Sequence, residues 1–178
     1  MEFGFDIIAA PGALKSLPGV LRGFAVRKPF VIAGPGIMGS AAFDAFKAVM
    51  PHDMIATVFV DAPTEPDEEA VISALALYRA TRADGLIVYG ARATLDFGKA
   101  VLLSVSQGGP LHKYAAADPE EIHSDQPPFI AIPMPHDIQE GVREPASIVL
   151  RGGRTVVLDS PHLTPKKVIL DLTLLENL

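Results

Sequence analysis

The sequence predicts an α/β protein built on a Rossmann-like parallel sheet flanked by helices, with an added β-hairpin. Five short apolar runs recur along the chain, and three helical patterns lie between the first four of them. Several runs are almost continuously apolar, which is typical of strands buried on both faces of a parallel sheet. Strands that alternate with helices over short connections indicate βαβ units. We expect residues 1–178 to form a single domain of this kind.

The individual elements follow from the spacing of apolar residues. In the second helical pattern, Val71, Leu75 and Tyr78 share one face, and acidic residues open the helix, where its dipole favours them. The first and third patterns are similarly spaced. The expected strands are residues 30–33, 55–60, 86–89, 129–132 and 168–170, and the expected helices are residues 40–50, 67–83 and 94–106.

Three segments depart from this alternation. Residues 107–128 are rich in Gly, Pro, Asp and Ala, and we expect a loop there with at most a short helix. Residues 133–145 are also expected to be irregular. Residues 147–150 and 155–158 are predicted to form a β-hairpin, because Gly152 and Gly153 between them supply the positive φ angles that a tight turn needs.

Composition excludes several classes of function. The net charge is −6, which argues against a nucleic-acid partner. The chain has no cysteine, so disulfides, thiolate metal sites and cysteine nucleophiles are ruled out. No apolar stretch approaches the roughly 20 residues of a membrane span, and the first residues do not resemble a signal peptide. We therefore expect a soluble, cytoplasmic protein that does not bind membranes.

A series of short motifs spans nearly the whole chain. They read PGAL at 11–14, DAPTEPD at 61–67, ADGLIVYG at 83–90, GGPL at 108–111, and SPHLTP at 160–165 followed by VILDLTL at 168–174. In this order and spacing they resemble the N-terminal domain of the iron-containing (group III) alcohol dehydrogenases, a family that includes maleylacetate reductases and relatives of glycerol dehydrogenase. The resemblance implies a dehydroquinate synthase-like N-terminal fold, an oxidoreductase function and an NAD(P) cofactor.

The resemblance extends, with changes, to the family's phosphate-binding loop. In the family, a Gly-Gly-Gly-Ser turn precedes an Asp and a Lys, and small residues let a pyrophosphate reach backbone amides at a helix N-terminus. Here residues 90–99 read GARATLDFGK, so the second and third glycines and the serine are replaced. The guanidinium of Arg92 either pairs with a phosphate, blocks one, or is simply solvated at the helix start. The cofactor-binding positions implied by this loop are Gly90, Ala91, Arg92, Asp96 and Lys99.

Two further segments bear on the cofactor. The family's second signature follows an Ile-Pro pair, and here only that pair, which includes Pro133, is kept. Residues 134–141 lack its hydroxyls and glycines at the matching positions, so this loop is not expected to bind a nucleotide in the family's way. At the end of the first nucleotide strand, Gly34 stands where NAD-dependent members carry an Asp, which favours NADP over NAD. Alternatively, Gly34 and Gly36 are turn residues.

No metal site is expected in this chain. The family's ligands are one Asp and three His of a helical C-terminal domain that begins just after the point where this sequence stops. The five histidines, at positions 52, 112, 123, 136 and 162, show no metal-binding spacing. His136 and Asp137 with Glu140 form the densest polar group, which is either a site or an exposed loop.

Two functional hypotheses remain open. The chain is either the nucleotide-binding half of an oxidoreductase, inactive alone and completed by a separate metal-binding chain, or a non-catalytic, degenerate module for protein association or ligand sensing. No residue is assigned a catalytic role. Because absence of the second domain leaves an apolar face, we also expect a homo-oligomer, such as an isologous dimer.

Overall fold

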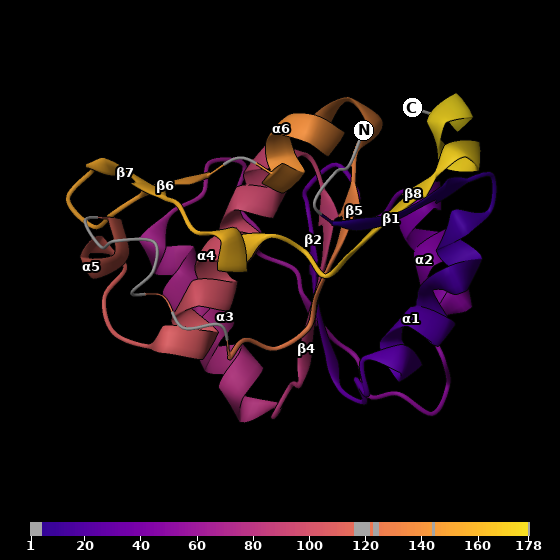
Figure 1. Cartoon of the computed structure of the whole chain (residues 1–178), viewed down its shortest axis with the longest axis horizontal. Helices are drawn as coiled ribbons and strands as arrows, with labels where there is room; N and C mark the ends of the chain where they lie inside the picture. Colours follow the sequence, from indigo (N-terminus) through magenta and orange to yellow (C-terminus); the bar gives the residue numbers. More distant parts are fainter. Residues whose placement is uncertain (1–4, 116–121, 123–124, 144, 178) are drawn as a thin grey trace.

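The computed structural model describes residues 5–115, 122, 125–143 and 145–177, and its centre is a six-stranded sheet (Figure 1). All neighbouring strands run parallel, which confirms the predicted Rossmann-like α/β fold. The strands, in their order across the sheet, are β1 (Asp6–Ala10), β8 (Lys167–Asp171), β5 (Phe129–Pro133), β4 (Gly85–Gly90), β2 (Pro29–Ala33) and β3 (Thr57–Phe59).

Helices cover both faces of the sheet. One face carries α1 (Leu17–Gly23) and α2 (Ala41–Val49), and the other carries α3 (Glu68–Ala80) and α4 (Arg92–Gln107) (Figure 1). Strand β2 serves both cores, since Val31 packs with α1 and α2, whereas Phe30 and Ile32 pack with α3 and α4. Burial on both faces explains why β2, β4 and β5 read as continuous apolar runs.

Helix starts are capped in different ways. The Ser40 hydroxyl accepts a hydrogen bond from the Phe43 amide at the start of α2, and the Asp67 carboxylate accepts one from the Ala70 amide at the start of α3. Helix α4 begins after Ala91, whose side chain cannot cap it. The longest helix in the described ranges, α4, has 16 residues, and no helix there is both long and apolar enough to cross a membrane.

The two edges of the sheet depart from the sequence prediction. No strand was expected before residue 30, yet β1 pairs with β8 over five residues. At the other edge, the predicted strand 55–60 is reduced to β3, and the flanking Ile55 and Val60 are 69% and 60% exposed. Both differences have one cause: an edge strand pairs on one side only, so fewer of its residues need to be buried.

The segment after β5 was wrongly predicted to be irregular. It forms a 3-10 turn, η3 (Pro135–Asp137), and a short helix, α6 (Ile138–Arg143). Local propensity does not favour a helix there. Contacts with α4 hold it instead, because Gly141 packs so closely on Leu95 that an added Cβ would lie 2.7 Å from that side chain.

The predicted hairpin is confirmed as antiparallel β6 (Ala146–Val149) and β7 (Thr155–Leu158), with Gly152 and Gly153 at φ 94° and 86°. It lies beside the start of α3, where the Val149 amide donates to the Pro66 carbonyl over 2.9 Å. The predicted short helix of residues 107–128 is α5 (His112–Ala115), while residues 116–121 and 123–124 lie outside the described ranges. The remaining 3-10 segments are η1 (Ala13–Ser16), η4 (Pro161–Leu163) and η5 (Leu172–Asn177). Of these, η1 starts within the PGAL motif of residues 11–14 and leads directly into α1.

Candidate functional site

The sheet changes its winding direction between β2 and β4. The chain passes from β2 through α2 on one face, and from β4 through α4 on the other, so the loops that leave these adjacent strands diverge. Ligands of open α/β sheets bind at such a position, outside the carboxyl ends of the strands. A cavity of about 220 Å³ lies there. The described residues that line it are Gly34, Pro35, Gly36, Ile37, Gly90, Ala91, Thr94 and Met134.

Two glycines bring the loops of this cavity close to α4. A Cβ added to Gly34 would lie 2.4 Å from Oγ1 of Thr94, and one added to Gly90 would lie 2.7 Å from the same atom. The Gly34 amide also donates to the Tyr89 carbonyl over 2.9 Å, which ties the end of β2 to the end of β4. Thr94 is 3% exposed. Both positions therefore need glycine, because any side chain would displace Thr94.

The structure brings only half of the predicted cofactor residues together. Gly34, Gly36, Gly90 and Ala91 line the cavity between β2 and β4. Of the described residues around it, Thr94 alone has a polar side chain. The described lining therefore supplies no acid or base for catalysis.

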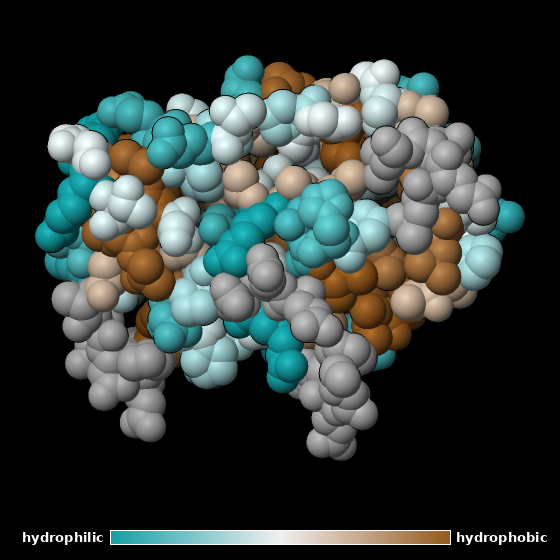
Figure 2. Space-filling model, turned by 90° about the horizontal axis from the view of Figure 1, so that it is seen from above, coloured by the Kyte–Doolittle hydropathy of each residue, from teal (hydrophilic) through white to brown (hydrophobic). Residues whose placement is uncertain are grey.

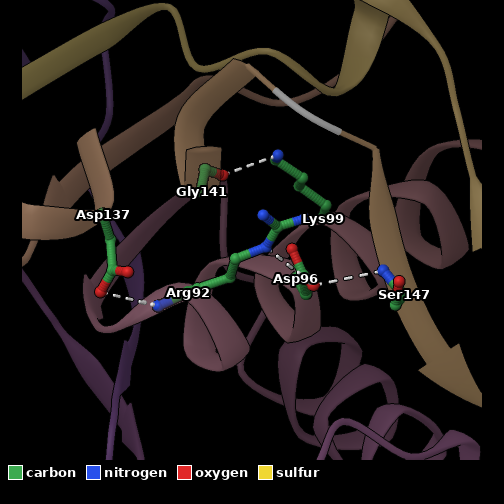
Figure 3. Close-up of polar contacts among 6 residues, drawn as sticks. All are labelled: Arg92, Asp96, Lys99, Asp137, Gly141 and Ser147. Atoms are coloured by element: carbon green, nitrogen blue, oxygen red, sulfur yellow. Dashed lines mark hydrogen bonds and ion pairs between the residues drawn. The ribbon is translucent and has the colours of Figure 1, made fainter. Parts of the chain in front are cut away.

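Arg92 and Asp96 lie in a different place, at the hairpin. The Arg92 guanidinium turns along α4 toward Asp96, with Nε 3.8 Å from Oδ2, and Asp96 also accepts a hydrogen bond from the Ser147 amide (Figure 3). Both residues line a second cavity, of about 330 Å³, between α4 and β6. In this arrangement, the Arg92 guanidinium neither points into the first cavity nor is freely solvated.

Lys99 is buried between α4 and α6. It is 2% exposed, and its ammonium donates to the Gly141 carbonyl over 2.8 Å (Figure 3). A buried ammonium requires such a partner, because desolvation without one is costly. The residue therefore holds α6 on α4 in this structure, rather than facing the cavity between β2 and β4.

Asp137 provides the start of α4 with a cap from outside the helix. Its Oδ2 accepts a hydrogen bond from the Arg92 amide over 3.2 Å, and the carboxylate is 13% exposed (Figure 3). Nε2 of His136 lies 3.3 Å from the same oxygen, but the His136 side chain is 75% exposed. A carboxylate at this end of a helix is favoured by the helix dipole. His136, Asp137 and Glu140 formed the densest polar group of the sequence. Asp137 contacts α4, whereas the Glu140 side chain lies outside what the structure describes.

Pro133 ends β5 beside a small separate cavity of about 20 Å³, which Tyr89 and Asp171 also line. Burial, together with the nearby Asp171 carboxylate, raises the pKa of Tyr89 to about 12. The phenol is therefore protonated at neutral pH, and it is not poised to exchange a proton there.

In the described ranges, no three His, Asp or Glu side chains converge on a point where they would hold a metal ion. His123 lies outside these ranges. The described residues thus do not fit the metal that the family resemblance implies, and we derive no chemical step through it.

Sequence reasoning missed Thr94 and Met134 as cavity residues. Thr94 was taken only as the first residue of a helix, although its position four residues after Gly90 places it on the first turn of α4. Met134 follows the Ile-Pro pair, and its amide donates to the Gly90 carbonyl over 3.1 Å. The one available signal was the family resemblance, in which both positions border the two cofactor loops.

Comparison with known proteins identifies the family. Residues 6–172 match the sequence model of the iron-containing alcohol dehydrogenases. The chain belongs to this family. A curated relative, the 4-hydroxybutyrate dehydrogenase of Cupriavidus necator, is 28% identical over 166 residues, which cover 90% of this chain and 42% of that protein.

Solved structures of a dehydrogenase and a reductase share the fold. Alcohol dehydrogenase from Oenococcus oeni superposes with a TM-score of 0.83 at 17% identity, covering 97% of this chain and 46% of that one. Sulfoacetaldehyde reductase from Bifidobacterium kashiwanohense, crystallised with NAD⁺, gives 0.80 at 17% identity, covering 94% and 44%. This chain therefore spans less than half the length of the relatives it matches.

Proposed function

We propose that this chain is the nucleotide-binding half of an iron-containing alcohol dehydrogenase-type oxidoreductase, with the nucleotide in the cavity between β2 and β4. One observation carries the proposal: the cavity lies where the sheet changes direction, and glycine lines both of its loops. Family membership adds support, since the reductase of similar fold was crystallised with NAD⁺.

NADP is the expected cofactor, with NAD as the alternative. Gly34 follows the last residue of β2 and carries no carboxylate, so nothing at that position repels a 2′-phosphate. Gly36 borders open space, since a Cβ added there would meet no atom within 4 Å. The first turn of α4 adds the positive end of a 16-residue helix beside Ala91.

The rest of the reaction is assigned to another domain or chain. Hydride transfer needs an alcohol held and polarised next to the nicotinamide, and in this family that chemistry is supplied by iron or a similar ion. The described residues offer no ligand set for it. We expect no dehydrogenase activity from this chain alone, so alcohol oxidation by the pure protein with added iron or zinc would contradict the proposal. Oxidation of a short hydroxy acid, as the name of the Cupriavidus relative suggests, is our hypothesis for the completed enzyme.

Calorimetric titration of the chain with NADP, NAD and ADP tests the proposal. We expect micromolar binding of NADP, with NAD no tighter. Gly36→Phe places a bulky side chain at the cavity wall, where its Cβ meets no atom within 4 Å, and should weaken binding at least tenfold. Gly19→Phe, at an exposed position of α1 that is equally free of neighbours, is the matched control and should leave binding unchanged.

A second candidate function is a non-catalytic module for protein association or for sensing another ligand. The observation that favours it is Ala91 and Arg92 at the turn into α4, where the family carries glycines. If the titration detects no binding of NADP, NAD or ADP, this candidate is favoured over the first.

Under both candidate functions, we expect the chain to associate with a second copy of itself or with a separate metal-domain subunit. We also expect it to be cytoplasmic. On the face above the carboxyl ends of the strands, hydrophobic surface gathers in two areas with a hydrophilic band between them (Figure 2). Exposed apolar patches of this kind mark association surfaces. We expect a dimer by light scattering, and a clean monomer would count against this part of the proposal.

A further inference from the structure

The segment that follows β5 is joined to the end of β4 and to α4 at three points. The Met134 amide donates to the Gly90 carbonyl, the Asp137 carboxylate accepts from the Arg92 amide, and the Lys99 ammonium donates to the Gly141 carbonyl. The first two contacts lie beside the cavity, which both Met134 and Gly90 line. This segment therefore borders the cavity on the side where α4 begins.

The central contact places a negative charge at the first turn of α4, on the residue that follows Ala91 of the cavity wall. The positive end of a helix attracts one anion readily, because the free amides and the helix dipole act together. Here the Arg92 amide is already satisfied by a carboxylate from the same chain, at 3.2 Å. That carboxylate is 13% exposed, so its field is screened less than that of a surface group.

We propose that Asp137 is a specificity-determining residue: its carboxylate competes with the phosphate groups of a nucleotide for the start of α4. The inference rests on the proposed function, because it assumes that a nucleotide enters the cavity. It predicts that ligands with a diphosphate bind weakly to the native chain, whereas the nucleoside part is unaffected. Strong diphosphate binding then requires the Asp137 carboxylate to move off the Arg92 amide.

The test compares ADP with adenosine, which lacks the phosphates, by calorimetry on the full chain. Asp137→Ala should bind ADP about tenfold more tightly than the native protein, as expected when one repulsive charge beside the ligand is removed. Its affinity for adenosine should change less than about twofold. Asp137→Asn keeps an acceptor for the Arg92 amide without the charge, should give a smaller gain for ADP, and provides the test if the alanine variant does not fold.

Asp53→Asn is the matched control for net charge. Asp53 pairs with Arg22 at an exposed position between α2 and β3, at the amino ends of the strands and so at the end of the sheet opposite the cavity; neither affinity should change. Equal ADP binding by the native chain and both Asp137 variants overturns the inference alone. An equal gain for adenosine and ADP also overturns it, since the charge would then not be the cause. If neither ligand binds any variant, the proposed function fails and the inference fails with it.

Discussion

Replacing Asp171 with Asn is expected to destabilise the fold strongly. The carboxylate ends β8 and is 7% exposed. Its Oδ1 accepts hydrogen bonds from the Gly12 amide at 2.9 Å, the Thr173 amide at 3.0 Å and the Thr173 hydroxyl at 2.6 Å, while Oδ2 accepts from the Leu14 amide at 2.9 Å. The side chain thereby ties the end of β8 to the turn that follows β1.

The magnitude follows from counting acceptors. An asparagine keeps one oxygen, so its best orientation retains the three bonds to Oδ1 and turns an NH₂ group toward the Leu14 amide. Losing a bond to a charged acceptor costs about 1.5–3 kcal/mol, and the remaining bonds weaken when the charge is removed. We expect a loss of about 3 kcal/mol in the free energy of unfolding. For a domain of this size that corresponds to a fall of roughly 6–12 °C in Tm.

The same carboxylate predicts a pH dependence. Burial on its own would raise the pKa of Asp171, but the hydrogen bonds from Thr173 and from the Leu14 and Gly12 amides outweigh it and hold the pKa below its usual value. A group with a lowered folded pKa stabilises the fold above its unfolded pKa of about 3.9 and loses that contribution as the pH falls through the folded value. The charge-dependent part of the difference between native protein and Asp171→Asn should therefore be full at neutral pH and shrink in acid.

Urea unfolding followed by circular dichroism, together with calorimetry, measures both effects. Asp53→Asn, which removes an equal charge from an exposed pair, is the control and should change the free energy of unfolding by less than about 0.5 kcal/mol. A loss below about 1 kcal/mol for Asp171→Asn, or a difference that does not vary with pH, would refute the reasoning.

Two further predictions concern glycines that pack closely at α4, namely Gly34 and Gly98, with Gly19 of α1 as the comparison for the second. Gly34→Ala should cost about 1–3 kcal/mol, because the new Cβ would lie 2.4 Å from Oγ1 of Thr94; adding Thr94→Ala should recover much of this loss in urea unfolding. Gly98→Ala should also destabilise, since its Cβ would lie 2.4 Å from a Val88 methyl. By contrast, Gly19→Ala in α1 meets no atom within 4 Å and should stabilise by about 0.4–1 kcal/mol.

Each of these packing predictions has an outcome that contradicts it. Additive costs for Gly34→Ala and Thr94→Ala would show that the two residues do not compete for the same space. Equal effects of Gly98→Ala and Gly19→Ala in thermal unfolding would show that helix propensity, rather than contact with β4, decides at residue 98.

Continuous burial made the centre of the fold predictable from sequence. Strands β2, β4 and β5 are covered on both faces, so their apolar runs coincide with the strands to within a residue or two. Strand β1 escaped prediction because its five residues are exposed or only partly buried, and no local pattern marks a strand whose pairing comes from residues as distant as 167–171.

Site residues could be predicted where backbone geometry requires a small residue. They could not be predicted where contacts with residues distant in sequence set the direction of a side chain. The glycines at 34, 36 and 90 follow from the need for small residues at strand ends, and they line the cavity between β2 and β4. The direction of the Arg92 side chain depends on Asp96 and on the hairpin that follows 50 residues later along the chain. The bond from Lys99 to Gly141 depends on a helix that local propensity does not predict. Tertiary contact, rather than composition, decides both.

The pairing of β1 with β8 imposes an order on folding during synthesis. Residues 6–10 are synthesised well before residues 167–171, the strand with which they pair among the described residues, and the amides of Gly12 and Leu14 gain the Asp171 carboxylate as acceptor only once that strand is made. Contacts this distant in sequence form late and slow the folding of a chain. Until then, β5 has an open edge where β8 belongs, which other nascent chains can join. Chaperones that shield this edge should therefore improve the yield of folded protein more than they improve its final stability.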